Sequence, residues 1–230
     1  LAVPGIDLLK ADKDDKTPLT IAQEKGYVES ARMIQAAING QPIPRHMPRL
    51  SKQEAQKRLT AMKVDKKSYG DELVDAAYAN CTEKLITLLA AGANVNHANE
   101  YSNTPLREAA DNGHTACVKL LLAAPGIKVN KADKFGRTPL YWAAVDGKTE
   151  CVKLLLAAPG IDVNKADKDG QTPLYWAAYK GHTEIVKLLL AAPGIDVNKA
   201  NKYGRTPLYE AARKGYTEIV KLLKAAGAKE

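Results

Sequence analysis

Apolar and polar positions along this chain follow a pattern that repeats every 34 residues. The tripeptide Thr-Pro-Leu marks the period, beginning at Thr104, Thr138, Thr172 and Thr206. The run Val-Lys-Leu-Leu-Leu-Ala-Ala-Pro-Gly-Ile occurs three times, at 118–127, 152–161 and 186–195. A fixed period of this length is typical of repeat architectures, in which each unit buries its apolar face only against its neighbours. The pattern therefore predicts a stack of similar units.

Each unit predicts two helices joined by a turn. Thr138 is a good N-cap, and Pro139 suits the first helical position, where its missing N–H has no partner to lose. We expect the first helix to stop at Gly147, because a residue without a Cβ readily adopts the left-handed conformation that ends helices. Thr149 is expected to cap the second helix. The run 151–156 is almost wholly apolar, which predicts that the next unit covers it.

Two turns are predicted after the second helix. Pro159 and Gly160 suit the second and third positions of a type II turn. The tetrapeptide Asp-Lys-Asp-Gly at 167–170 predicts another turn, with Asp at its first position and Gly at its last. The residues between these turns are expected to project as a finger before the next Thr-Pro-Leu.

These motifs resemble the ankyrin repeat, whose pattern is D-x-x-G-x-T-P-L-H-x-A-A-x-x-G-H followed by an apolar second helix and G-A-x-V-N. The resemblance extends over residues 69–230 and 1–38. It implies an all-α ankyrin-repeat solenoid of stacked helix-turn-helix units with β-turn or hairpin fingers. The loop after the second helix carries one extra residue. Where the family has His after Thr-Pro-Leu, this chain has Thr20, Arg107, Tyr141, Tyr175 and Tyr209, and we expect the tyrosines to pack between repeats.

The resemblance divides the chain into three parts. Residues 69–230 are expected to form the array, with a repeat like an N-terminal cap followed by four repeats. Residues 1–40 begin in the middle of a repeat and resemble a C-terminal capping repeat. Placing Val220–Leu223 directly before Leu1 regenerates the repeat, so we expect residues 1–38 to stack after Leu223, in the same chain or in a neighbouring copy. Circular permutation and an engineered origin both fit this order and the near-identity of the internal repeats.

The segment 41–68 is a basic linker. It holds eight Lys or Arg residues against two acids. Ser51 and Glu54 are spaced as a capping box, which predicts a short helix over about residues 52–63. We interpret the linker as a solvated, flexible tether, with a binding tract as the alternative.

Composition narrows the classes of function. No apolar run is long enough to span a bilayer, so we expect no membrane role. The three cysteines lack the spacing of a disulfide framework or a zinc site, so we expect no metal role and a reducing compartment. Cys117 and Cys151 are expected to be small buried hydrophobes, and His114 and His182 are not expected to bind metal. We expect the cytoplasm, with export as an effector as the alternative. The net charge of +8 favours an acidic partner, but most of the surplus lies in the linker, so a nucleic-acid partner is not expected.

No catalytic motif or phosphate-binding loop is recognisable, so we expect neither enzyme activity nor a cofactor. The resemblance implies a protein partner, of unknown identity, bound on the concave side formed by the finger tips and the exposed face of each first helix. The positions that correspond are Tyr101, Glu108, Asp111, Phe135, Trp142, Val145, Asp146, Asp169, Trp176, Tyr179, Lys180, Tyr203, Glu210, Arg213 and Lys214. The alternative for the two tryptophans is that they fill space between neighbouring first helices. The alternative for the whole chain is a structural scaffold that self-associates through residues 1–38.

Overall fold

The computed structural model describes residues 50–229, which fall into two compact units. One comprises residues 50–69 and 83–93, and the other comprises residues 70–82 and 94–229. Three predictions lie outside the described residues: the capping segment at 1–40, its stacking after Leu223, and the first part of the linker.

The first unit contains the helix predicted in the linker, α3, which spans Lys52–Ala61. Ser51 caps it, because the Ser51 hydroxyl accepts a hydrogen bond from the Glu54 backbone N–H at 3.2 Å. The Glu54 carboxylate does not close the predicted capping box. It pairs with Arg58 at 3.4 Å.

Packing in this unit corrects the interpretation of the linker as a tether. Ala55 and Leu59 of α3 are fully buried. The unit also holds the short 3₁₀ helix η1 (Lys66–Ser68) and nearly all of α5 (Thr82–Ala91). Burying two apolar side chains on one helix favours a fixed position for that helix, so the flexible-tether interpretation is wrong for residues 52–61.

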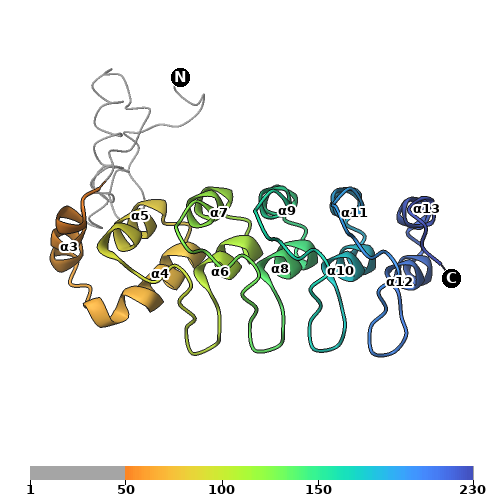
Figure 1. The fold of residues 1–230 in the computed structure, drawn as a ribbon, viewed down its shortest axis with the longest axis horizontal. Helices are drawn as coiled ribbons and strands as arrows, with labels where there is room; N and C mark the ends of the chain where they lie inside the picture. The colour runs from red at the N-terminus through yellow and green to blue at the C-terminus, as the bar shows by residue number, and fades with distance from the viewer. Residues whose placement is uncertain (1–49, 230) are drawn as a thin grey trace, which may run out of the picture. The chain divides into compact units, whose positions relative to one another are not determined.

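The second unit is an array of helix pairs. Its helices are α4 (Tyr69–Tyr78), α6 (Pro105–Asp111), α7 (Thr115–Leu122), α8 (Pro139–Val145), α9 (Thr149–Leu156), α10 (Pro173–Lys180), α11 (Thr183–Leu190), α12 (Pro207–Lys214) and α13 (Thr217–Ala225). From α6 onward, each first helix packs on the next first helix and each second helix on the next second helix. Figure 1 shows these as two rows, with the finger loops extending below α6, α8, α10 and α12. Residues 50–229 contain helices and no strand, which confirms the all-α repeat architecture.

The first helices begin after the predicted threonine N-cap, whereas the second helices have no threonine at the N-cap position. The Thr138 hydroxyl accepts a hydrogen bond from the Tyr141 N–H at 3.1 Å, and the other three Thr-Pro-Leu sites repeat this geometry. The prediction for Thr149 was wrong. Thr149 is the first residue of α9, and the cap is Lys148, which makes no side-chain capping bond. The run 151–156 contributes Cys151, Val152 and Leu155 to the core.

Both predicted turns are present. The Ile161 N–H donates to the Ala158 carbonyl across Pro159 and Gly160, and the Gly170 N–H donates to the Asp167 carbonyl at 3.0 Å.

An asparagine in each loop joins neighbouring repeats. The Asn130 side-chain amide donates to the Gly160 carbonyl at 2.6 Å, and its Oδ1 accepts from the Asp162 N–H at 2.9 Å. Asn96, Asn164 and Asn198 make the same pair of bonds. This ladder explains why an asparagine stands at positions 96, 130, 164 and 198. The side chain satisfies backbone groups of the next loop that would otherwise lack a partner.

No helix within residues 50–229 has both the length and the apolar character needed to cross a membrane.

Candidate functional site

The fingers and first helices of the four repeats form one continuous surface (Figure 1), which we name the finger face. It comprises residues 99–112, 133–146, 167–180 and 201–214. All of them lie in the second unit.

Each finger is held in a fixed conformation by the residue that begins it. The Asp133 carboxylate accepts hydrogen bonds from the Phe135 and Arg137 N–H groups at 2.9 and 3.1 Å. Asn99, Asp167 and Asn201 do the same in the other fingers. Neighbouring fingers are also joined, since the Lys168 N–H donates to the Phe135 carbonyl at 2.8 Å. The finger tips are therefore rigid supports for their side chains.

Aromatic side chains are exposed on these tips, as predicted. Tyr101, Phe135 and Tyr203 occupy equivalent positions, and Phe135, at 47 % exposure, is the least exposed of the three. Asp169, the fourth member of the set, is also exposed. These large side chains lie at the surface and not in the core of the repeats.

Trp142 lies between two arginines. The Arg107 and Arg137 guanidinium groups lie 4.5 and 4.3 Å from its ring centroid, and Arg137 also lies 4.5 Å from the Phe135 ring. Trp142 is half-buried. It therefore fills space, as the alternative interpretation expected, and it also presents part of its ring at the surface. The sequence analysis missed both arginines, because they come from different repeats and only the fold brings them to one ring.

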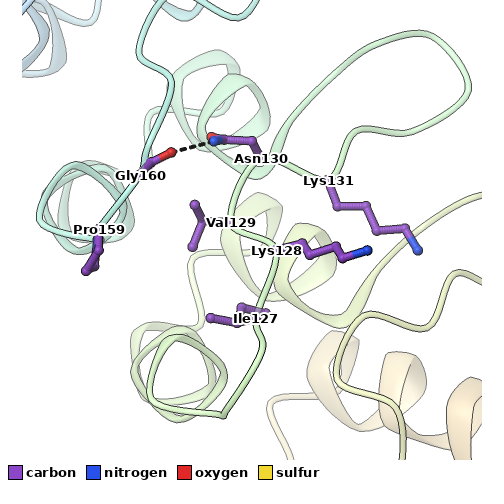
Figure 2. Close-up of a pocket in the computed structure, with 7 residues that line it drawn as sticks. All are labelled: Ile127, Lys128, Val129, Asn130, Lys131, Pro159 and Gly160. Atoms are coloured by element: carbon purple, nitrogen blue, oxygen red, sulfur yellow. Dashed lines mark hydrogen bonds between the residues drawn. The ribbon is translucent and has the colours of Figure 1, made fainter.

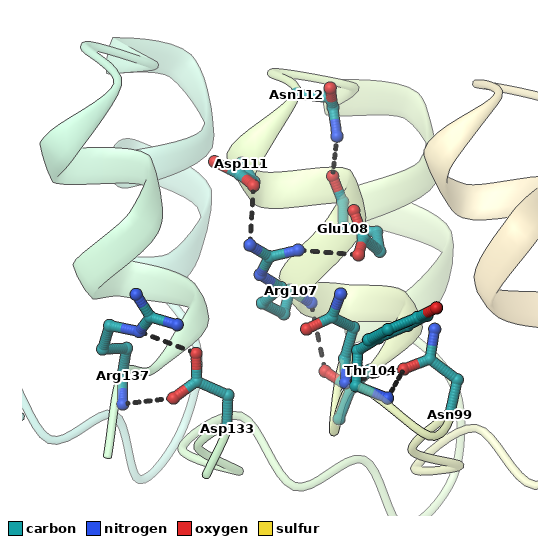
Figure 3. A network of polar contacts seen from close by, with 10 residues as sticks. Asn99, Thr104, Arg107, Glu108, Asp111, Asn112, Asp133 and Arg137 are labelled. Atoms are coloured by element: carbon teal, nitrogen blue, oxygen red, sulfur yellow. Dashed lines mark hydrogen bonds and ion pairs between the residues drawn. The ribbon is translucent and has the colours of Figure 1, made fainter. Parts of the chain in front are cut away.

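Carboxylates hold these arginines in place (Figure 3). Arg107 contacts Glu108 at 2.6 Å and Asp111 at 3.0 Å, and Arg137 contacts Asp133 at 2.8 Å. Glu108 is only 6 % exposed. Its expected place on the exposed face was wrong, because its carboxylate turns inward to the guanidinium group.

A second aromatic cluster lies on the third and fourth repeats. The Trp176 indole N–H donates to the Gln171 side chain at 3.1 Å, and the Tyr179 ring lies edge-on to it at 5.3 Å. The Lys214 ammonium lies 4.5 Å from the centroid of the Tyr179 ring, and Arg213 lies nearby at 5.8 Å. Trp176, Tyr179, Lys214 and Arg213 therefore form one contiguous group.

Glu210 is the buried acid of this region. It is 1 % exposed, bonds the Tyr175 hydroxyl at 3.0 Å and contacts Arg213 at 2.7 Å. As with Glu108, its expected exposure was wrong. Burying a carboxylate is costly unless it is paired and hydrogen-bonded, and both conditions are met here. Glu210 thus positions Arg213. Within this ion pair, the Arg213 guanidinium group is the exposed member.

Two further acids lie at the ends of α6 and α8. Asp111 also has the Asp146 side chain as a neighbour. Burial, followed by the interaction with Asp146, raises the pKa of Asp111 to about 7. Val145 is half-buried beside Asp146, whereas Asp146 and Lys180 are exposed.

Two of the three tyrosines that follow Thr-Pro-Leu pack between repeats, as predicted. Tyr141 and Tyr175 are each 4 % exposed, and the Tyr141 hydroxyl donates to Asp167 of the next repeat at 2.9 Å. Burial and the contact with Glu210 raise the pKa of Tyr175 to about 12. Tyr209 is 48 % exposed, so the prediction was wrong for this residue within the described part of the chain.

The cysteines and histidines have structural roles. Cys117 and Cys151 are buried as expected, and burial raises the pKa of each thiol to about 11. The His114 and His182 rings contact the backbone carbonyls of Tyr78 and Val145 in the preceding repeat. Among residues 50–229 no group of three or more His, Cys, Asp or Glu side chains is placed to hold a metal ion.

A surface depression of about 540 Å³ lies between two loops, away from the finger tips (Figure 2). It is lined by Ile127, Lys128, Val129, Asn130, Lys131, Pro159 and Gly160. Its polar groups are engaged between repeats, since Asn130 bonds Gly160 and the Lys131 ammonium donates to the Asn96 carbonyl at 2.6 Å. The depression therefore lacks the convergent polar groups that orient a small-molecule ligand.

Comparison with known families agrees with the geometry. A family model described as ankyrin repeats (3 copies) matches residues 73–167 and 159–229, which together span the whole finger face. A search of curated proteins found no match.

Proposed function

The chain belongs to the ankyrin-repeat family, and we propose that it binds a protein partner through the finger face. Ankyrin repeats are in general protein–protein interaction modules, and proteins built from them are typically non-enzymatic. The family indicates the kind of partner, and the geometry of the finger face supports the choice of surface.

One observation carries the proposal: the group formed by Phe135, Trp142 and Arg137. An exposed aromatic tip, a half-buried indole and a guanidinium group in contact with both rings lie together, and a hydrogen bond to Asp133 holds the guanidinium group. Trp, Tyr and Arg dominate the energetics of interfaces, and groups that are already rigid lose little entropy when they bind.

The exposure of each side chain changes the predicted set of partner-binding residues. Glu108 and Glu210 act through the arginines that they hold, so the proposed contacts are Tyr101, Asp111, Phe135, Trp142, Val145, Asp146, Asp169, Trp176, Tyr179, Lys180, Tyr203, Arg213 and Lys214, together with Arg137.

The proposal is tested by affinity capture from the source cell followed by mass spectrometry. The bait is the full chain, and the test variant is Phe135→Ala/Trp142→Ala. The matched control, Lys153→Ala/Lys187→Ala, alters exposed side chains of the second helices that pair with Glu150 and Glu184. We expect a partner captured by the wild type and the control but not by the test variant. A partner that the test variant retains and the control loses would contradict the proposal.

A second proposal is a structural role in which residues 1–38 stack on α12 and α13, in the same chain or in a second copy. It is supported by the exposure of Tyr209, which is 48 % against 4 % for Tyr175 at the equivalent position. Size-exclusion chromatography with light scattering tests the assembly form of this role, because a strict monomer at all concentrations excludes the second copy.

We also propose a reducing compartment such as the cytoplasm. Free thiols at Cys81, Cys117 and Cys151 support it.

A further inference from the structure

The finger face carries a gradient of charge along the array. In equal windows, residues 99–112 hold three acids and one arginine, and residues 201–214 hold four cations and one acid. The windows 133–146 and 167–180 are each balanced. The formal charge therefore runs from −2 through zero to +3 over four repeats whose backbones are otherwise equivalent.

The acidic end is built around Asp111. On its own helix, Arg107 divides its guanidinium group between Asp111 and Glu108, so one cation faces two acids. From the end of α8, Asp146 places another acid beside Asp111 and raises its pKa. A third acid, Glu100, is exposed on the adjacent finger tip. This end has more carboxylates than cations.

Two further ionisable groups lie at or just beyond the C-terminal end of α6. The Lys148 side chain packs against Gly113, just beyond α6. His114, at the start of α7, directs its Nε2 to the Tyr78 carbonyl at 2.9 Å.

The basic end shows the opposite surplus. Glu210 is the one acid in window 201–214, and it is buried against Arg213 at 2.7 Å, with Arg205 at 3.7 Å. Lys214 lies over the Tyr179 ring, and Lys180 is exposed one repeat earlier. Lys202 pairs with Asp169 across the finger tips at 3.2 Å. The exposed side chains at this end are therefore mainly cations supported by aromatic rings.

Between the two ends lie the half-buried rings of Trp142 and Trp176. Neighbouring helices are separated by about 8–10 Å, so the three steps between the first and fourth repeats cover about 30 Å. An extended chain rises about 3.3 Å per residue and covers this span with about nine residues.

We propose that the finger face binds one extended polypeptide segment with a basic end, an apolar middle and an acidic end. The basic end lies over residues 99–112 and Asp146, and the acidic end lies over Arg205, Arg213 and Lys214. This inference rests on the proposed function and adds the charge order and orientation of the partner segment. Complementary charges of this kind fix the register of a complex and exclude segments of the wrong order.

The test uses two synthetic peptides of about twelve residues with equal composition. In the block peptide, lysines occupy one end, tyrosines and leucines the middle and glutamates the other end. In the alternating peptide, lysines and glutamates are interleaved at the two ends. We expect the block peptide to bind the full chain at least about tenfold more tightly by calorimetry at low salt, since several weak pairs of about twofold to fivefold each act together. Equal dissociation constants, or no binding by either peptide, would overturn the inference.

Orientation is read from a photo-crosslinker placed on the basic end of the block peptide. We expect labelling within residues 99–146, and labelling within residues 201–214 would overturn the inference. The variant Lys180→Glu/Lys214→Glu alters exposed cations at the other end and should weaken the block peptide about tenfold or more while leaving the alternating peptide nearly unchanged. Equal weakening of both peptides also counts against the inference.

The pH dependence supplies an independent readout. Because the pKa of Asp111 is raised to about 7, the Asp111–Asp146 pair gains a second negative charge as the pH rises from 6 to 8. The affinity of the block peptide should rise over this range in the wild type and stay flat in Asp111→Asn. A wild-type affinity that does not change with pH would contradict the placement of the basic end.

The two proposals fail in different ways. A cellular partner that is lost on Phe135→Ala/Trp142→Ala but is indifferent to Lys180→Glu/Lys214→Glu would leave the proposed function standing and overturn the charge order.

Discussion

The asparagine ladder gives the most quantitative prediction about the scaffold. Replacing Asn130 by Ala removes both bonds to the next loop, the 2.6 Å bond to the Gly160 carbonyl and the 2.9 Å bond from the Asp162 N–H. Each such bond contributes about 0.5–1.5 kcal/mol net. We therefore expect Asn130→Ala to lower the free energy of unfolding by about 1–3 kcal/mol.

The matched control is Asn198→Ala, at the equivalent position two repeats later. Its side-chain amide lies 3.3 Å from the Gly227 carbonyl, a longer and weaker bond than that of Asn130. The control should cost less than Asn130→Ala, because its amide bond is weaker although its Oδ1 bond to the Lys229 N–H is as short, at 2.8 Å. Because repeat arrays are stabilised by nearest-neighbour interfaces, a loss in the middle should also reduce the cooperativity of unfolding.

The assay is urea unfolding, followed by helical circular dichroism and by the fluorescence of Trp142 and Trp176. Asn130→Ala should separate the two unfolding curves, since the affected interface joins the first and second repeats. An unfolding free energy within about 0.3 kcal/mol of the wild type would refute the claim that these bonds join the repeats. A cost no greater than that of Asn198→Ala would refute the magnitude worked from the distances.

Three further predictions concern single groups. Tyr175→Phe should cost about 1–3 kcal/mol in chemical denaturation, because it leaves buried Glu210 without a hydroxyl donor. The pKa of Asp111 in the folded chain is raised from 3.8 to about 7, so its contribution to stability is complete only below pH 3.8 and is lost as the pH rises from there through about 7. Asp111→Asn should flatten the dependence of the unfolding free energy on pH over that range, and an unchanged dependence would count against the raised pKa. Neutralising Lys57, Lys66 and Lys67 should leave partner affinity and its salt dependence unchanged, and a flatter salt dependence would identify the linker as a binding tract.

The scaffold could be predicted from the sequence because its signals are local and periodic. Thr138 caps a helix through a residue three positions away, and Gly160 turns the chain between its immediate neighbours. Thr149 was misplaced by one position, because Thr suits both a cap and a first turn and the sequence alone does not distinguish them.

The candidate face could be predicted only in part. Repeat spacing identified Trp142 and Phe135 as candidate contacts. It did not identify Arg107 and Arg137, because these arginines come from different repeats and contact the same Trp142 ring only in the folded chain. The burial of Glu108 and Glu210 was missed for a similar reason. An acid on the outward side of a short helix turns inward when a neighbouring cation is available, and that choice depends on side-chain geometry that periodicity does not encode.

The most direct test of the central claim is calorimetry with a partner identified by capture. Phe135→Ala and Trp142→Ala should each weaken binding by about 1–3 kcal/mol with the fold intact, because truncating aromatic anchors at an interface costs this much. Lys187→Ala, on the second helices, should leave the affinity unchanged. Equal losses from changes on the finger face and on the second helices would contradict the account.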